Sequence, residues 1–287
     1  MNEKNRTEKG VLYLVGTPIG NLSDMSERAI KILSEVDFIA AEDTRNSLRL
    51  LTHLGIKKPM ISYFEHNKQE RGEQIIARLK AGESGALITD AGMPAISDPG
   101  EDLVRLCADE GVTVSTVPGP CAAITALTLS ALPTGRFSFE GFLSANKSER
   151  RAALAELKDE KRTMIFHEAP HKLKATLADM LSAFGGDRKI ALCRELTKLN
   201  EQVLRTTLEG AVAYYEENDP RGEFVLVLEG ATGEESKKAF WEDMTIPAHV
   251  SYYIDKGMSK NDAVKAAAKD RKVPKNEVYK EVLEIKA

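Results

Sequence analysis

The segment from Gly85 to Gly100 decides the fold class, and it reads GALITDAGMPAISDPG. Its first four residues are small or apolar, as in a buried strand, and the remainder is dominated by small residues, acids and prolines. Pro94 and Pro99 lack a backbone donor and have a fixed φ, so this part can form neither a helix nor a central strand. In an open α/β sheet, ligands bind at the carboxyl ends of strands. The segment therefore predicts either a ligand-binding loop or a rigid connection at a strand end.

Strand-like and helix-like segments alternate on both sides of this stretch. The first strand is expected at 11–15, with the sequence VLYLV, and GTPIGNL follows it directly. Further strands are expected at 38–41, 60–63, 86–88 and 112–117. Helical segments separate these strands, and such alternation indicates a mostly parallel sheet with helices on both faces. We assign residues 1–133 to this first α/β domain, which ends at a Leu-Pro-Thr-Gly turn.

The pattern changes after residue 133. Strand-like segments alternate less regularly with helical ones, and they are expected at 137–143, 163–166, 190–193, 203–207 and 224–228. We assign residues 134–230 to a second α/β domain with a mixed sheet.

The C-terminal part differs in charge from both domains. A linker is expected at 231–245, followed at 246–287 by three short helices in a helix-turn-helix-like basic module. Between Lys256 and Lys286 there are nine Lys or Arg and five Asp or Glu, whereas the whole chain has a net charge of −4. Such a surface favours binding to phosphates. The small core of the module is expected to contain Ala263, Val264, Ala267, Val278, Tyr279 and Leu283.

The composition excludes several classes of protein. The chain has 287 residues, of which 42% are hydrophobic and 29% are charged, as in a globular protein. No apolar run approaches the roughly 20 residues that span a bilayer, and the polar N-terminus does not match a signal peptide. The three cysteines are widely spaced, which argues against a disulfide framework or a zinc site and favours the cytoplasm.

Two short motifs indicate chemistry that their context does not support. GTPIGN at 16–21 follows a strand, and Glu42 and Asp43 end the next one, as in a dinucleotide-binding fold. However, the glycines are spaced G-x-x-x-G instead of G-x-G-x-x-G, and Pro18 has no donor to offer a pyrophosphate. HEAPH at 167–171 matches the zinc motif H-E-x-x-H, but its proline would break the helix that this motif requires. We therefore expect no metal site.

Seven segments occur in the order that is found in one family. They are LYLVGTPIGNL at 12–22, AAEDTR at 40–45, DAGMPAISDPG at 90–100, VPGP at 117–120, GFL at 141–143, EAPH at 168–171 and RELTK at 194–198. With these segments the chain closely resembles the small-subunit ribosomal RNA cytidine-2′-O-methyltransferases of the tetrapyrrole-methylase fold family. The resemblance covers nearly the whole chain, including the basic tail. Met93, Cys121 and His167 stand where this family usually has Thr, Ser and Tyr.

The resemblance implies S-adenosyl-L-methionine (SAM), held in a cleft between two α/β domains of tetrapyrrole-methylase type. It implies methyl transfer to a cytidine 2′-hydroxyl in the decoding-centre region of 16S ribosomal RNA, with much of the rate coming from positioning. It also implies a cytoplasmic homodimer that acts on small-subunit ribosomal RNA or on the 30S subunit. The cofactor-binding residues that it implies are Pro18, Ile19, Asp90, Gly92, Met93, Pro94, Ile96, Ser97, Cys121, Ala122 and Phe166.

The catalytic and substrate-binding groups are expected at strand ends across the cleft. The candidates for a base or an orienting group are Asp43, Glu168, His171 and Glu195. The candidates for phosphate contacts are Arg45, Arg194 and Lys198. The sequence does not choose among them. In the loop itself, Asp90 and Asp98 are expected to accept hydrogen bonds from the backbone and so to hold its shape.

Three other functions stay open at this point. One is methylation of a tetrapyrrole or another small molecule, which the basic tail disfavours. Another is binding to the ribosome without turnover, which the crowded charged strand ends disfavour. The last is nicotinamide-dependent oxidoreduction, which the spacing of the glycines disfavours.

Overall fold

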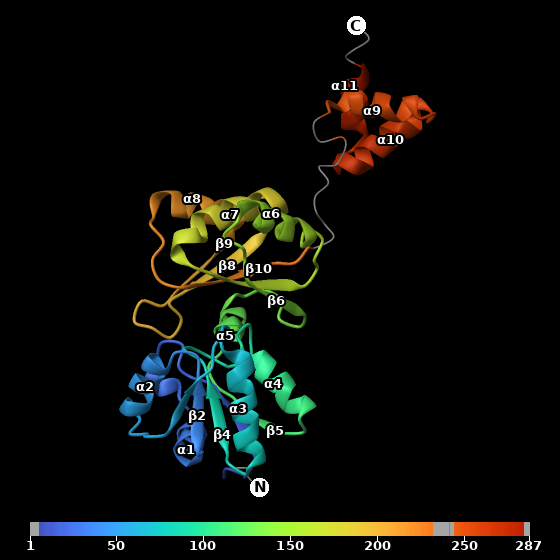
Figure 1. Cartoon of the computed structure of the whole chain (residues 1–287). Helices are drawn as coiled ribbons and strands as arrows, with labels where there is room; N and C mark the ends of the chain where they lie inside the picture. The colour runs from blue at the N-terminus through green and yellow to red at the C-terminus, as the bar shows by residue number, and fades with distance from the viewer. Residues whose placement is uncertain (1–5, 232–240, 242–243, 284–287) are drawn as a thin grey trace. The chain divides into compact units, whose positions relative to one another are not determined.

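The computed structural model describes residues 6–231, 241 and 244–283, and its contacts divide the chain into two compact units (Figure 1). One unit comprises residues 1–230 and contains two β-sheets, and the other lies within residues 231–287. Over the described residues, every helix is too short or too polar to cross a membrane.

The first sheet is parallel throughout, with the strand order β3-β2-β4-β1-β5. Its strands are β1 (Val11–Val15), β2 (Phe38–Ala41), β3 (Met60–Ser62), β4 (Gly85–Ile88) and β5 (Thr113–Val117). The 3-10 helix η1 (Leu22–Asp24) and helices α1 (Glu27–Glu35) and α2 (Thr44–His53) follow the first two strands, and α3 (Lys68–Lys80) and α4 (Gly100–Asp109) follow the next two.

Successive side chains of β1 point to opposite faces of this sheet. Val11, Tyr13 and Val15 pack against α1 and α2, whereas Leu12 packs against α3 and α4. Both faces are therefore covered by helices, which confirms the predicted α/β architecture. The carboxyl ends of the strands all lie at one edge, because the strands are parallel.

The second sheet is mixed, with the order β6-β7-β10-β8-β9, and only β6 and β7 form a parallel pair. Its strands are β6 (Phe137–Phe142), β7 (Thr163–Glu168), β8 (Lys189–Arg194), β9 (Gln202–Thr207) and β10 (Phe224–Leu228). Helices α6 (Lys147–Glu156), α7 (Pro170–Phe184) and α8 (Leu208–Glu217) cover one face.

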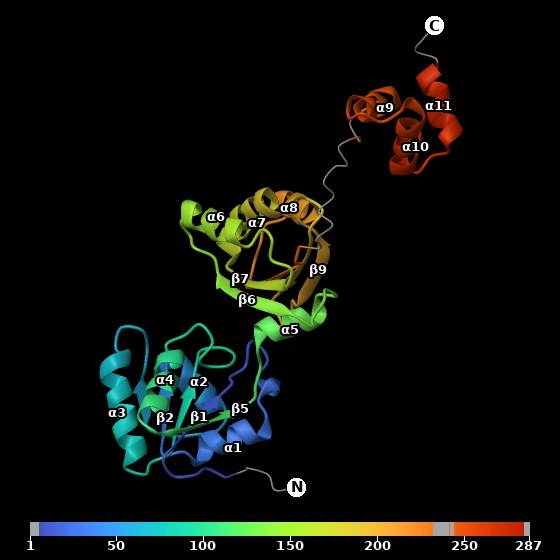
Figure 2. The same cartoon turned by 90° about the vertical axis from the view of Figure 1, so that its right-hand side faces the viewer.

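Helix α5 (Ala122–Leu129) covers the other face of the second sheet (Figure 2). Its residues Ala123, Ala126 and Leu127 pack with Ile165 and Val225 of that sheet. This helix precedes residue 133, so a segment that we placed at the end of the first domain packs against the second sheet. The chain therefore passes from one sheet to the other between β5 and α5.

The C-terminal unit consists of α9 (Ile246–Asp255), α10 (Lys260–Arg271) and α11 (Lys275–Leu283). Its core includes Ala263, Val264, Ala267 and Val278, as predicted, together with Val250 and Ala268. The prediction for Tyr279 is wrong, because its side chain is 43% exposed, and the side chain of Leu283 lies outside the described residues.

A buried histidine joins the segments of this unit. Trp241 stacks on His249 with ring centroids 5.5 Å apart, and Nε of Arg271 donates to Nδ1 of His249 at 3.1 Å. Nε2 of the same ring lies 3.3 Å from Oδ2 of Asp270, which accepts a hydrogen bond from Tyr253 at 2.5 Å. Because Nδ1 accepts a hydrogen bond, the imidazole is neutral in this arrangement. Burial, and then the charge of Arg271, lower the pKa of His249.

We expect the C-terminal unit to lose stability as the pH falls below about 6.5, the ordinary pKa of histidine. The lowered pKa of His249 means that the unfolded chain binds the proton first, so this contribution to the free energy of unfolding is complete above pH 6.5 and declines toward the folded-state pKa. Trp241 is the single tryptophan of the chain, so its fluorescence during urea unfolding reports on this unit. The variant His249→Asn keeps an acceptor and should remove the decline below about pH 6.5. An unchanged decline in this variant would contradict the assignment.

Candidate active site

A cavity of about 680 Å³ lies between the carboxyl-end loops of the first sheet and the second sheet. Small-molecule sites in proteins range from about 300 to 1,000 Å³, so this cavity can hold a nucleoside-sized ligand. Its lining comes from the loops after β1, β2, β4 and β5, and from the ends of β6, β7, β8 and β10. The cleft that we expected between two α/β layers is therefore present, and the segment from Thr89 to Pro99 contributes much of its wall.

Three loops of the first sheet are locked together by their backbones. The N–H of Thr17 donates to the carbonyl of Gly92 at 2.9 Å, and the N–H of Gly92 donates back at 3.1 Å. The Thr17 hydroxyl also donates to the carbonyl of Thr89 at 3.0 Å. In the third loop, a Cβ on Gly119 would lie 2.9 Å from Cα of Gly16, so these two backbones touch. The loops after β1, β4 and β5 therefore form one connected wall.

The loop after β4 has a backbone that most residues avoid. Ala95 and Ser97 have φ values of +66° and +58°, in the left-handed region. Such conformations cost on the order of 1–3 kcal/mol each and cluster at functional sites. Oδ1 of Asp98 accepts hydrogen bonds from the N–H groups of Ala95 at 3.0 Å and Gly100 at 2.7 Å. The predicted loop-holding role of Asp98 is confirmed.

The role that we predicted for Asp90 is different in the structure. Oδ2 of Asp90 accepts a hydrogen bond from the side chain of Asn46 at 3.2 Å, which ties the loop to α2 instead of to its own backbone. Glu42 lies nearby in the lining and accepts a hydrogen bond from Thr89 at 3.3 Å. Burial, and then the charge of Asp90, raise the pKa of Glu42. A carboxylate with a raised pKa in a cavity wall is a candidate proton acceptor.

An ion-pair network occupies the loop after β8. Nζ of Lys198, a lining residue, contacts Oε1 of Glu195 at 2.9 Å and Oε2 of Glu223 at 2.8 Å. Partial burial disfavours the charged form, but the two carboxylates raise the pKa of Lys198. Glu195 lies outside the lining and accepts the N–H of Glu223 at 2.9 Å, which, with Lys198, lowers the pKa of Glu195. Glu195 thus positions Lys198, which is itself a lining residue.

Glu168 contributes to the lining, but its carboxylate is used within the protein. The side chain is 1% exposed, and its oxygens accept hydrogen bonds from the hydroxyl of Thr176 at 2.5 Å and the N–H of Ala169 at 2.8 Å. Nζ of Lys172 lies 3.5 Å away. The carboxylate therefore joins the end of β7 to the first turns of α7.

We expect Glu168→Ala to lower the free energy of unfolding by about 2 kcal/mol or more, because two buried donors lose their acceptor. The measurement is urea unfolding of the full chain followed by circular dichroism. Glu168→Gln, which keeps a carbonyl oxygen at this place, should lose less. A variant with wild-type stability and a turnover reduced by two orders of magnitude would instead make Glu168 a catalytic residue.

Phe166 does not line the cavity, in contrast to our expectation for a cofactor-binding residue. Its side chain is fully buried with Leu173 and Leu177 on the α7 face of the second sheet. Because side chains alternate along a strand, the next residue, His167, faces the cavity instead. Burial lowers the pKa of His167, and its Nε2 is buried without a hydrogen-bond partner among the described residues. His167, one position after the predicted Phe166, is therefore a residue of β7 that lines the cavity.

The remaining predicted residues divide between the lining and its surroundings. Those in the lining are Ile19, Asp90, Gly92, Met93, Ile96, Ser97, Cys121, Ala122, Glu168, His171 and Lys198. Those outside it are Pro18, Pro94, Phe166, Asp43, Arg45, Arg194 and Glu195. The lining also includes His167, one of the three positions where the chain departs from the family. Among the lining residues that we did not predict as site residues are Glu42, Phe139, Gly141, Phe142, Leu196 and Glu223. Several of these lie in sequence segments that we had singled out, such as GFL at 141–143.

Asp43 is the N-cap of α2, and its carboxylate is hydrogen-bonded to Arg45. It accepts hydrogen bonds from the guanidinium group of Arg45 at 2.9 Å and from the backbone N–H of the same residue at 2.8 Å. These bonds lower the pKa of Asp43 to about 2. Arg194 lies at the end of β8 and contacts Oε1 of Gln202 at 3.3 Å. Asp43, Arg45 and Arg194 all lie outside the lining of the cavity.

The segment HEAPH spans the junction of a strand and a helix. His167 belongs to β7, whereas His171 lies in the first turn of α7, which begins at Pro170. The zinc motif needs both imidazoles on one face of one helix, and this geometry does not provide it. Within residues 6–231, 241 and 244–283, no group of three or more His, Cys, Asp or Glu is placed to hold a metal ion.

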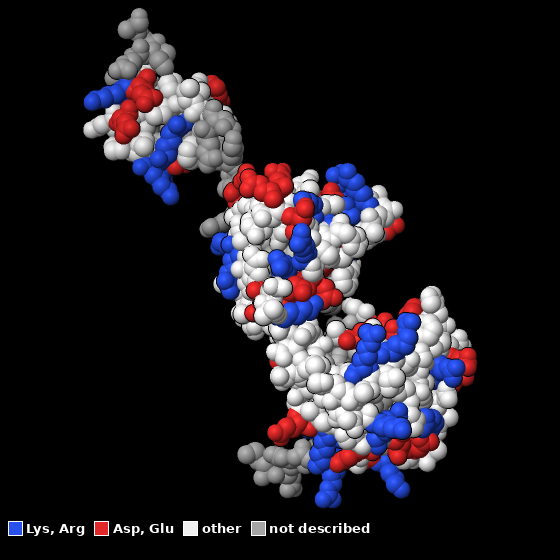
Figure 3. Space-filling model, turned by 90° about the vertical axis from the view of Figure 1, so that its left-hand side faces the viewer, with Lys and Arg blue, Asp and Glu red and all other residues white. Residues whose placement is uncertain are grey.

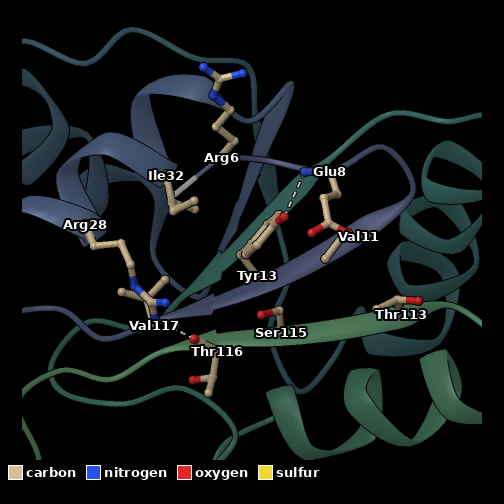
Figure 4. A pocket seen from close by; sticks show the side chains of 10 residues that line it. All are labelled: Arg6, Glu8, Val11, Tyr13, Arg28, Ile32, Thr113, Ser115, Thr116 and Val117. Atoms are coloured by element: carbon tan, nitrogen blue, oxygen red, sulfur yellow. Dashed lines mark hydrogen bonds between the residues drawn. The ribbon is translucent and has the colours of Figure 1, made fainter. Parts of the chain in front are cut away.

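A second hollow, beside β5, has space of only about 20 Å³, enough for one water molecule (Figure 4). Its polar groups contact one another: Arg28 donates to the carbonyl of Thr116 at 2.8 Å, and the hydroxyl of Tyr13 accepts the N–H of Glu8 at 2.8 Å. This hollow is too small for a cofactor, so the large cavity is the candidate active site.

Comparison with known proteins agrees with this geometry. The family described as Tetrapyrrole (Corrin/Porphyrin) Methylases matches residues 11–212. The chain is 50% identical to a protein of Halalkalibacterium halodurans over 96% of both chains, and 47% identical to one of Bacillus subtilis over 97% of this chain and 96% of the other. A protein of Escherichia coli O157:H7 is 42% identical over 96% of both. Each of these relatives is named ribosomal RNA small subunit methyltransferase I.

Two solved structures share the fold at low identity. Uroporphyrin-III-C-methyltransferase from Thermus thermophilus matches with a TM-score of 0.54 and 19% identity, over 78% of this chain and 96% of that one. A cobalt precorrin-4 methyltransferase matches with a TM-score of 0.56 and 17% identity, over 77% and 95%.

The fold and the cavity define a two-sheet α/β protein with a ligand site at the carboxyl ends of its first sheet. The chain belongs to the tetrapyrrole methylase family, which confirms the resemblance seen in its sequence.

Proposed function

We propose that this chain is a SAM-dependent methyltransferase that modifies the ribose 2′-hydroxyl of a cytidine in small-subunit ribosomal RNA. The observation that carries the proposal is the identity of 42 to 50% to the relatives above, which extends over 96% or more of this chain and includes the C-terminal unit. The fold neighbours at 17 and 19% identity support the fold alone and do not bear on the substrate.

The part of the wall that comes from the loops after β4 and β5 suits the cofactor because it contains several small residues. Gly92, Met93 and Ser97 from one loop, and Cys121 and Ala122 from the next, would hold it through close backbone contacts. When bound, SAM supplies a methyl group on a sulfonium, which is already activated for displacement. The protein therefore needs mainly to bind and orient the hydroxyl and to exclude water.

The proton of the attacking hydroxyl must pass to a group at the cavity wall. Glu42, whose pKa is raised, and the exposed imidazole of His171 both lie in the lining and can accept it. Proton acceptance of this kind contributes about 10²–10⁴-fold to a rate. Lys198 lies in the same lining and can contact a phosphate of the RNA.

Lysines of the C-terminal unit provide a second contact to RNA. Those that are exposed are Lys256, Lys260, Lys265, Lys269, Lys272, Lys275 and Lys280. On the face of this unit drawn in Figure 3, Lys and Arg side chains reach the surface beside several acidic ones. Exposed lysines bind phosphates without reading the sequence, so we assign this unit to affinity and the cavity to chemistry.

The test uses the purified full chain, SAM with a labelled methyl group, and 30S subunits that lack the modification. After digestion of the RNA, the label should be found on the ribose of cytidine. Label on a base, or no label, would overturn the proposal, and label on a tetrapyrrole offered in parallel would favour the small-molecule alternative. The homodimer and the cytoplasmic location stay predictions, and sedimentation equilibrium would test the first.

A further inference from the structure

Phe142 is an exposed aromatic side chain in the wall of the cavity. It is the last residue of β6, and it is 63% exposed although it lies in the lining. Large apolar side chains at a cavity are ordinarily covered, because exposing a ring to water costs about 25 cal/mol for each Å². An exposed ring at this place therefore needs a reason other than packing.

A β-bulge turns this ring toward the cavity. Phe139 pairs with Ile165, and the next residue of β7, Phe166, pairs with Gly141. Strand β6 therefore contains one extra residue between Phe139 and Gly141, and Phe142 pairs with His167. In a regular strand, residues three apart point to opposite faces, and Phe142 would join the covered α7 face. The extra residue places Phe142 on the same face as Phe139. Gly141 makes this possible with a φ of +65°. Bulges are rare in parallel pairs and often re-aim a side chain beside an active site.

The ring is supported by His167 and has the ammonium group of Lys172 over it. His167 meets Phe142 edge to face with centroids 5.3 Å apart, and it meets Phe139 in the same way at 5.1 Å. Nζ of Lys172 lies 5.6 Å from the centroid of Phe142. An exposed aromatic face beside a lysine is the combination with which proteins bind unstacked bases of single-stranded nucleic acid.

We propose that Phe142 is the stacking platform for a base of the RNA substrate, namely the base of the nucleotide whose ribose enters the cavity. The proposal rests on the proposed function, since it needs an RNA substrate. His167 and Phe139 hold the platform, and Lys172 contacts a neighbouring phosphate. Stacking on a ring is tolerant of base identity, so the platform contributes affinity and position, and not the choice of cytosine.

The adenine ring of the cofactor is the other planar base that could reach this cavity. The position of Phe142 argues for the RNA, because this 63% exposed ring stands on β6 of the second sheet, whereas the cofactor is proposed to lie against the loops after β4 and β5. The two sources predict different outcomes when the ring is removed. Removal of a ring that stacks on RNA weakens RNA binding alone, whereas removal of a ring that stacks on adenine weakens SAM binding.

The test compares Phe142→Ala with the wild-type full chain in two binding measurements. Affinity for unmodified 30S subunits, measured by filter binding, should fall roughly 5- to 100-fold, the range found for removal of one stacking ring. Affinity for SAM, measured by isothermal titration calorimetry, should stay within about twofold. Phe142→Trp should keep most of the affinity for 30S subunits, because its ring also stacks. Thermal unfolding checks that each variant is folded.

Phe137 provides a matched control on the same strand. It is 39% exposed and lies at the other end of β6, outside the lining, so Phe137→Ala should change neither affinity. Unchanged 30S binding by Phe142→Ala, or an equal loss in Phe137→Ala, would overturn the platform. A loss of SAM affinity that accounts for the whole effect would assign the ring to adenine. Absence of methylation by the wild type would instead count against the proposed function, since the binding assays do not depend on turnover.

Discussion

Replacing Gly119 with valine should abolish cofactor binding, with a loss of SAM affinity of at least about 100-fold, which corresponds to about 2.7 kcal/mol. A Cβ at this position would lie 2.9 Å from Cα and 3.2 Å from the carbonyl carbon of Gly16. Both are backbone atoms that cannot rotate away, so the loops after β1 and β5 must separate. Cys121 and Ala122 follow Gly119 closely and lie in the lining, so they would move with it. Isothermal titration of SAM into the full chain measures the loss.

The same substitution at Gly135 is the control for this experiment. No heavy atom lies within 4 Å of a Cβ built on Gly135, so Gly135→Val should bind SAM like the wild type. Thermal unfolding of both variants separates loss of the site from loss of the fold. Wild-type affinity in Gly119→Val would show that the contact between the loops does not shape the cofactor site, and the proposed placement of SAM would have to change.

Much of the site could be located from sequence because glycine and proline restrict the backbone locally. The segments after β1, β4 and β5 contain these residues in combinations that no helix or central strand accepts, and each follows an apolar run. Parallel strands bring their carboxyl ends to one edge, so the convergence of the three loops followed from the strand–helix alternation. The role of Asp98 followed in the same way, because a short acid in a turn bonds nearby backbone donors.

The second half of the site depended on features that sequence alone does not fix. We predicted that the strand before the EAPH segment ends at Phe166. In the structure β7 continues to Glu168, and the residue that faces the cavity is His167. Apolar character did not reveal which face Phe166 occupies, because both faces of this sheet are covered by helices. The bulge at Gly141 changes the alternation by one residue, and only the pairing with β7 reveals it. Phe142 was therefore missed.

Charged candidates were the hardest to assign, for a related reason. Asp43, Glu168 and Glu195 all stand at strand ends, as expected for a catalytic acid or base. In the structure each carboxylate is held by the protein itself, through Arg45, Thr176 and Lys198 respectively. Strand ends bring many polar groups together, and most of them bond one another before they can bond a ligand. Only the hydrogen-bond partners distinguish the two cases.

Removal of residues 231–287 should weaken binding to 30S subunits by about 10- to 100-fold at moderate salt and leave SAM affinity unchanged. The C-terminal unit has its own core around Val264 and Val278, and each of the two sheets has separate cores, so we expect the shortened chain to fold. For each RNA phosphate that the shortened chain no longer neutralises, the slope of log affinity against log salt should become shallower by about 0.7 to 0.9. Filter binding at several salt concentrations gives both quantities, and calorimetry gives the SAM affinity.

A full-length variant distinguishes lost charge from lost structure. Replacement of the exposed Lys269, Lys272 and Lys280 by glutamine removes three charges without removing the helices, and the slope should fall by up to about two to three. The matched control replaces three exposed lysines of the first unit that lie outside the cavity, namely Lys57, Lys158 and Lys161, with the same change in net charge. If both triple variants reduce the slope equally, the effect is one of net charge. If only the C-terminal variant reduces the slope, these lysines bind phosphates directly. A direct contact depends on the position of the lysine, whereas an effect of net charge would be the same for both variants.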